Sequence, residues 1–148
     1  EIVHSHHELG GEVAPMSLDR GHTMPLFKGG SSAVILANLP ASRLKRLYER
    51  NATHPDLPEG IRDWASFAKH YRRIRKEGHY ISREEIDPGL VGIAAPIFND
   101  GQHVVGAITL VYEKGREKLV NEEGYAELVR SCAATITEKI AAAAERTS

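Results

Sequence analysis

The chain has 148 residues, of which 41% are hydrophobic and 26% charged, so it can bury one sizeable core and is not intrinsically disordered. Nineteen Lys and Arg against twenty Asp and Glu give a formal net charge of −1, which disfavours DNA or RNA binding by this chain alone. A single cysteine, Cys132, excludes an intrachain disulfide and a cysteine-based zinc site.

The N-terminal third predicts strands followed by two helices. Residues 1–28 contain short apolar stretches separated by turn signals, which is typical of irregular strands. A small-residue loop, 29–32, then precedes a short and largely apolar helix over 33–39, and Pro40 ends that helix. Residues 41–50 have the pattern of an amphipathic helix.

The middle of the chain predicts a loop, a helix and a strand. Apolar residues at spacings of three and four over 61–77 indicate a helix, and Gly78 is a typical residue to end it. Residues 79–84 then predict a strand, and Asp87-Pro88-Gly89 a turn.

The C-terminal part predicts two central strands and a long helix. The runs 90–98 and 103–112 are strongly apolar, and Asn99-Asp100-Gly101 between them is a hairpin signal. The expected final helix, 121–146, has an apolar stripe through Tyr125, Leu128, Val129, Cys132, Ile136 and Ile140. Because a tight hairpin joins antiparallel strands, the sequence predicts an α+β fold with an antiparallel sheet and helices packed on it.

The loop before the first helix admits three interpretations. Gly29-Gly30-Ser31-Ser32-Ala33 resembles a nucleophile elbow, but Ala33 replaces the last glycine and the chain has no large parallel sheet, so an esterase is disfavoured. The residues also suit an ordinary helix N-cap. Thirdly, unpaired N–H groups at a helix start next to small residues can bind a carboxylate.

Other candidate features have simpler explanations. His4, His6 and His7 could suggest a metal, but no cysteine or acidic pair lies at ligand spacing nearby, so no metal or cofactor is expected. The basic run 69–76 is interpreted as the solvated face of its helix. Cys132 lies on an apolar stripe and is expected to be a buried small hydrophobe.

Three stretches, taken together, resemble the IclR-family transcriptional regulators. The first is Met24 to Ala37, and the second is Ile74 to Tyr80 followed by Glu84-Glu85 and Gly89. The third runs from Ile93 to Asn99 and on through Val104 to Thr109. Their order and spacing match the family over almost the whole chain.

The resemblance implies a GAF-like effector-binding domain spanning residues 1–148. In this family such a domain follows a winged helix-turn-helix that binds DNA, and we expect that part to be absent from this chain, which begins at Glu1. The family's effectors include small carboxylates, so the implied ligand is a small organic acid. The ligand-binding positions of the family fall on Met16, Met24, Gly30, Ser31, Ser82, Gly92, Thr109 and Val111.

The expected function is therefore regulatory, and the chain is not expected to be an enzyme. We predict a homodimer or homotetramer in the cytoplasm, in contact with DNA only through the missing domain and without a membrane segment. Two alternatives stay open. One is a dimerisation module without a ligand, and the other is an enzyme on a GAF-like scaffold, such as a methionine sulfoxide reductase, for which one cysteine is too few.

Overall fold

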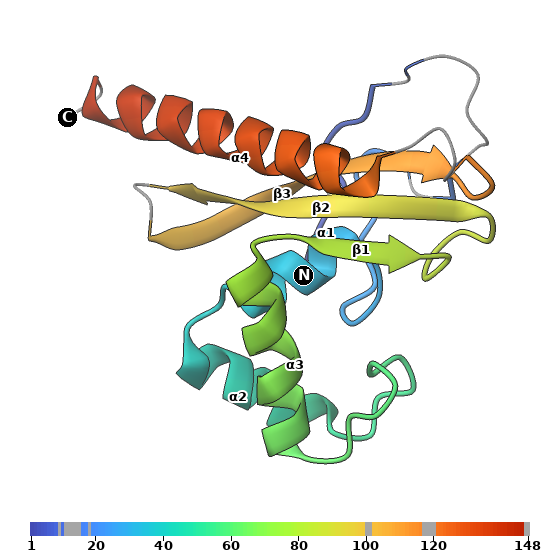
Figure 1. Cartoon of the computed structure of the whole chain (residues 1–148). Helices are drawn as coiled ribbons and strands as arrows, with labels where there is room; N and C mark the ends of the chain where they lie inside the picture. Colours follow the sequence, from blue (N-terminus) through green and yellow to red (C-terminus); the bar gives the residue numbers. More distant parts are fainter. Residues whose placement is uncertain (9, 11–15, 18, 100–101, 117–120, 147–148) are drawn as a thin grey trace.

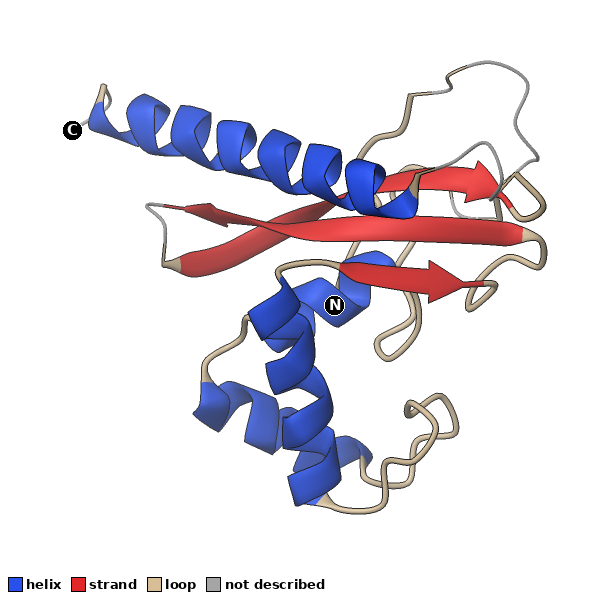
Figure 2. Cartoon of the chain, in the orientation of Figure 1, coloured by secondary structure: helices blue, strands red, loops and turns tan. Residues whose placement is uncertain are grey.

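The computed structural model describes residues 1–8, 10, 16–17, 19–99, 102–116 and 121–146 (Figure 1). Within this part, three strands form one antiparallel sheet in the order β1-β2-β3, and helices flank it (Figure 2). The predicted α+β class is confirmed. The elements are α1 Gly30–Ala37, α2 Ala41–Asn51, α3 Trp64–Glu77, β1 Tyr80–Arg83, β2 Leu90–Asn99, β3 His103–Glu113 and α4 Glu122–Glu145.

The sheet separates two helical layers. The long helix α4 lies along one face, and α1 lies on the other face with α2 and α3 beyond it (Figure 1). Because successive side chains of a strand point to opposite faces, β2 supplies both layers. Ile93, Ala95 and Ile97 pack towards α4, whereas Ala94 joins the cluster around α1, which is the alternation expected of a strand.

The core below the sheet is aromatic and centres on α3. Phe67 is completely buried, and its ring contacts those of Phe27, Tyr48, Trp64 and Tyr71 at centroid distances of 4.8–6.1 Å. Such ring pairs add stability beyond the area they bury. Residues of α1 pack against this aromatic cluster on the side of the helix away from the sheet.

The ends of α3 follow from local chemistry. The sequence predicted a start at residue 61, but the helix begins at Trp64 because Asp63 and Ser66 form a reciprocal capping box. Gly78 ends the helix in the left-handed conformation (φ 71°), which a glycine adopts without steric cost, as predicted.

The central hairpin is antiparallel, as predicted, with a register from Leu90 opposite Glu113 to Asn99 opposite His103. Residues 100–101 of the predicted turn lie outside the described part of the chain. A register shift falls between Ile97 and Phe98.

Two strand predictions need correction. Within the described residues, 103–113 pairs only with β2 and is therefore an edge strand, not a central one. The described residues between 1 and 28 hold a single antiparallel bridge, Val3 to Thr23, instead of full strands. Few apolar side chains alternate there, so little burial is available to offset the ordering of the backbone.

The buried stripe of α4 differs from the predicted one. Ala126, Val129 and Ala133 face the sheet, while Leu128 is 50% exposed and Cys132 only half-buried. Small residues allow a close approach to a sheet surface already filled by large side chains, so alanines take the central positions. None of the helices in the described residues combines the length and apolarity that a membrane span requires.

Candidate functional site

The start of α1 is shaped by a glycine and a glutamate. Gly29 is the N-cap residue and has φ 85°, a conformation that side chains strongly disfavour. A Cβ at this position would lie 2.5 Å from Cδ1 of Ile86, so the loop after β1 closes directly on the glycine. The Gly29 N–H donates to Oε2 of Glu85 at 2.8 Å.

The next three N–H groups of α1 are available. An α-helix leaves its first N–H groups without an intrahelical partner. Among the described residues, the hydrogen bonds give no acceptor to the N–H groups of Gly30, Ser31 and Ser32. The positive end of the helix dipole adds to their attraction for negative charge.

Two hydroxyl groups meet across the gap between α1 and the sheet. Oγ of Ser31 lies 2.8 Å from Oγ1 of Thr109, although the two residues are 78 positions apart in sequence. Either hydroxyl can donate to the other. This contact links the first turn of α1 to β3.

Two glycines allow the close packing around these hydroxyls. A Cβ on Gly30 would lie 2.8 Å from Cβ of Ala94 and 3.5 Å from Oγ of Ser82. A Cβ on Gly92 would lie 3.0 Å from the same Ser82 oxygen and 3.2 Å from Cγ2 of Thr109. The Ser82 hydroxyl itself is buried and donates to the carbonyl oxygen of Gly92 at 3.4 Å.

The structure therefore brings together five of the eight predicted site residues: Gly30, Ser31, Ser82, Gly92 and Thr109. We call these five the polar cluster. Of the other three, Val111 is the register partner of Gly92, and the methyl group of Met24 lies 4.0 Å from the Cβ position of Gly29. Met16 is half-buried, and its neighbour Ser17 donates to the Asp87 carboxylate, which places this stretch beside the loop between β1 and β2.

Glu85 was not among the predicted site residues. Besides the Gly29 N–H, its carboxylate accepts a hydrogen bond from the Tyr80 hydroxyl at 2.8 Å. Burial, and then the hydrogen bond to Glu85, raise the pKa of Tyr80, so this hydroxyl stays protonated and remains a donor. Glu84-Glu85 belongs to one of the stretches that resemble the family, but the spacing of residues in the sequence does not show that Glu85 reaches the start of α1.

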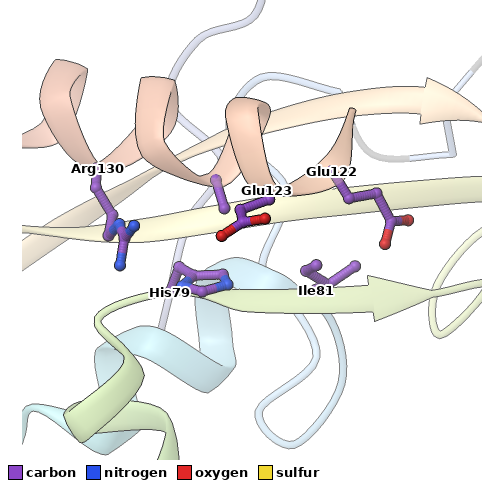
Figure 3. Close-up of a pocket in the computed structure, with 6 residues that line it drawn as sticks. His79, Ile81, Glu122, Glu123 and Arg130 are labelled. Carbon is purple, nitrogen blue, oxygen red and sulfur yellow. The ribbon is translucent and has the colours of Figure 1, made fainter. Parts of the chain in front are cut away.

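The opposite face of the sheet has a separate hollow of about 490 Å³, between the start of β1 and the first three turns of α4. Figure 3 shows His79 and Ile81 on one side and the side chains of Glu122, Glu123 and Arg130 on the other. None of the eight predicted site residues lines this hollow.

An ion-pair network borders the hollow. Arg83 holds both carboxylate oxygens of Glu122 at 2.7 Å, and the Tyr112 hydroxyl donates to the same carboxylate. These contacts, led by the hydrogen bond from Arg83, hold the pKa of Glu122 at about 2. Mainly through burial, the pKa of Tyr112 rises to about 12.

The other features singled out from the sequence find local partners. The Ser32 hydroxyl donates to the carbonyl oxygen of Pro25, and Ser31 contacts Thr109, so neither serine has a histidine partner within the described residues. Nε2 of His4 lies 3.3 Å from Nδ1 of His7. In the described part of the chain, no group of three or more histidine, cysteine or acidic residues could hold a metal ion.

Taken together, the fold and the polar cluster define a small α+β domain with polar side chains packed between a short helix and an antiparallel sheet. Residues 9–138 match the family model described as Bacterial transcriptional regulator IclR C-terminal. The chain therefore belongs to this family, as the sequence predicted.

A curated protein of similar sequence supports this assignment. The HTH-type transcriptional repressor AllR of Salmonella typhi is 28% identical over 120 residues, which are 79% of this chain and 43% of the repressor. The chain thus spans less than half of this curated relative. These matches are transcriptional regulators, in line with the expectation that the chain is not an enzyme.

Solved structures share the fold. The crystal structure of Thermotoga maritima IclR is similar with a TM-score of 0.75 and 25% identity, over 89% of this chain and 53% of that chain. The inducer-binding domain of the PobR transcription factor from Acinetobacter, a double mutant in complex with 3-hydroxybenzoic acid, has a TM-score of 0.67 and 21% identity. That match covers 86% of this chain and 73% of the other.

Proposed function

We propose that this chain is the ligand-sensing domain of a transcriptional regulator and that it binds a small organic acid at the polar cluster. The observation that carries this proposal is that Ser31, Ser82 and Thr109 lie together at the first residues of α1, whose N–H groups have no acceptor among the described residues. Buried N–H groups need acceptors, and a carboxylate satisfies several of them at once. The hydroxyls supply further hydrogen bonds.

The chemistry of the surroundings supports a small ligand. The cluster lies beside the core around α1, and Met24 is close to the start of this helix. A thioether adapts its shape to differently sized apolar groups, so Met16 and Met24 are proposed as apolar walls. The PobR domain, which has a similar fold, forms a complex with 3-hydroxybenzoic acid, and this supports a small acid as the ligand here.

The polar cluster is closely packed, and this decides which variants test the proposal. Because even a Cβ on Gly30 would lie 2.8 Å from Ala94, Gly30→Leu would displace α1 from the sheet and would not simply fill a cavity. Ser31→Ala removes one hydroxyl without adding atoms and is the better probe.

The experiment begins with native mass spectrometry of the purified chain, which is expected to reveal a co-purified acid. Titration calorimetry then compares the parent chain with Ser31→Ala, which should weaken binding by about 0.5–1.5 kcal/mol, the usual net value of one hydrogen bond. Ser131→Ala, on the exposed side of α4, is the matched control and should bind like the parent. Equal affinities for all three chains would place the ligand elsewhere.

We propose that DNA is bound only by a helix-turn-helix domain outside this chain and that the acid alters that binding by shifting a conformational equilibrium. The net charge of −1 supports this division, because DNA affinity depends on neutralising phosphates. The full-length regulator should retard double-stranded DNA in a gel at moderate salt. Retardation by this chain alone would contradict the proposal.

The domain is further proposed to form a homodimer or homotetramer. Light scattering after size exclusion should give two or four times the chain mass of 16.3 kDa. If the chain associates but no acid binds or raises its melting temperature, it acts as a dimerisation module without a ligand.

A further inference from the structure

The contacts of Glu85 bear directly on the charge of the ligand. Its carboxylate is partly buried and reaches the beginning of α1, where it accepts hydrogen bonds of 2.8 Å from both the Gly29 N–H and the Tyr80 hydroxyl. This N–H immediately precedes those of Gly30 and Ser31. A negative charge of the protein itself therefore already lies at the positive end of the helix.

The loop between β1 and β2 holds this carboxylate in place. Ile86 packs against Gly29, which has no side chain to prevent that approach, and Tyr80 belongs to β1. The neighbouring Glu84 points elsewhere, because it bonds Lys114 and the N–H of Gly89. Of these two adjacent glutamates, only Glu85 contacts α1.

We propose that Glu85 is a specificity-determining residue that competes with acidic ligands for the start of α1. This role of Glu85 concerns the same site as the proposed function and rests on that function. A ligand carboxylate bound to the remaining N–H groups lies next to a like charge or displaces it, and both routes weaken binding. Glu85 thus keeps common monocarboxylates out unless other contacts of the ligand compensate.

The competition can be measured with acetate, which is small enough to take the place of the Glu85 carboxylate. Three variants of the whole chain are compared with the parent: Glu85→Ala, Glu85→Gln and the matched control Glu84→Gln. Acetate is titrated at constant ionic strength against chloride, and amide NMR shifts at Gly29 to Ser32 report binding at the helix start.

Both Glu85 variants should show saturable shifts at these amides with an apparent Kd roughly tenfold lower than in the parent chain, from the loss of one nearby like charge. Glu85→Ala should also gain about 2–3 °C in melting temperature from about 300 mM acetate. Glu84→Gln should behave like the parent.

Equal acetate affinity in the parent and the Glu85 variants, or the same gain in Glu84→Gln, would overturn the inference. If Glu85→Ala does not fold, Glu85→Gln decides the question, because glutamine keeps the size and the acceptor oxygen. The outcome is separate from that of the proposed function. The proposed function depends on an acid whose binding to the parent chain requires Ser31, whereas the inference is judged on acetate alone.

Discussion

Removing the charge of Glu122 tests how α4 is attached to the sheet. In Glu122→Gln, the bidentate contact with Arg83 is reduced to one hydrogen bond from the guanidinium to a neutral amide oxygen, and the Tyr112 hydroxyl loses a charged acceptor. A pKa of about 2 in place of the usual 4.5 corresponds to an upper limit of about 3–4 kcal/mol. Because the Arg83 side chain is half exposed, solvent screening reduces the expected loss to about 1–2 kcal/mol at pH 7.

The pH dependence has a definite sign. The folded state lowers the pKa of Glu122, so its carboxylate stabilises the fold fully above about pH 4.5, and this contribution is lost as the pH falls towards 2. Urea unfolding of the parent chain between pH 3 and 7 should show this loss. In Glu122→Gln that part of the pH dependence should be absent.

The matched control is Glu123→Gln. It removes the same charge from the same first turn of α4, so it has a similar effect on the helix dipole but leaves Arg83 and Tyr112 paired. The difference between the two variants therefore measures the network itself. If Glu122→Gln and Glu123→Gln lower the free energy of unfolding equally, the network does not stabilise the domain and the reasoning fails.

Three further predictions concern stability and are checked by urea unfolding. Gly60→Ala should cost about 1–2 kcal/mol, because Gly60 has a positive φ but open space around its Cβ position. Gly29→Ala should cost more, because Gly29 also has a positive φ and its Cβ would meet the side chain of Ile86. Equal losses of stability in the two variants would contradict this. Phe67→Ala should cost about 3–5 kcal/mol, and Leu128→Ala, at a half-exposed site, less than about 0.5 kcal/mol. The Thr137 hydroxyl accepts a hydrogen bond from the N–H of Phe98, the first residue of β2 after the register shift. Thr137→Val should therefore cost about 1 kcal/mol, whereas Thr137→Ser, which keeps the hydroxyl, should retain most of that stability.

Much of the local structure could be predicted from the sequence because it depends on neighbours in the chain. The apolar spacing of residues 61–77 predicted α3 to within three residues, and Gly78 ended it as expected. The alternation in β2 indicated which side chains share a face, and the structure shows that one of these faces packs against α4. The predictions were wrong where contacts with distant residues determine the structure, as for the position of β3, which lies at the edge of the sheet.

The candidate site also combines features that could be predicted from the sequence with contacts that could not. The family resemblance pointed to Gly30, Ser31 and Thr109, but a sequence contains no distance, and the 2.8 Å contact between the two hydroxyls exists only because α1 packs on β3. Glu85 was missed for the same reason. Its contact with Gly29 spans 56 positions and depends on how the β1–β2 loop folds back.

The four helices, the three strands after residue 78, their antiparallel hairpin and the family could all be predicted from the sequence. These follow from periodicity, turn residues and motif order, which act over a few positions or are read directly as a pattern. The tertiary structure alone decided which polar groups meet, that Glu85 lies at the start of α1, and that small residues of α4 face the sheet. Such contacts join segments far apart in the chain, and their geometry is fixed only when both helical layers pack on the sheet.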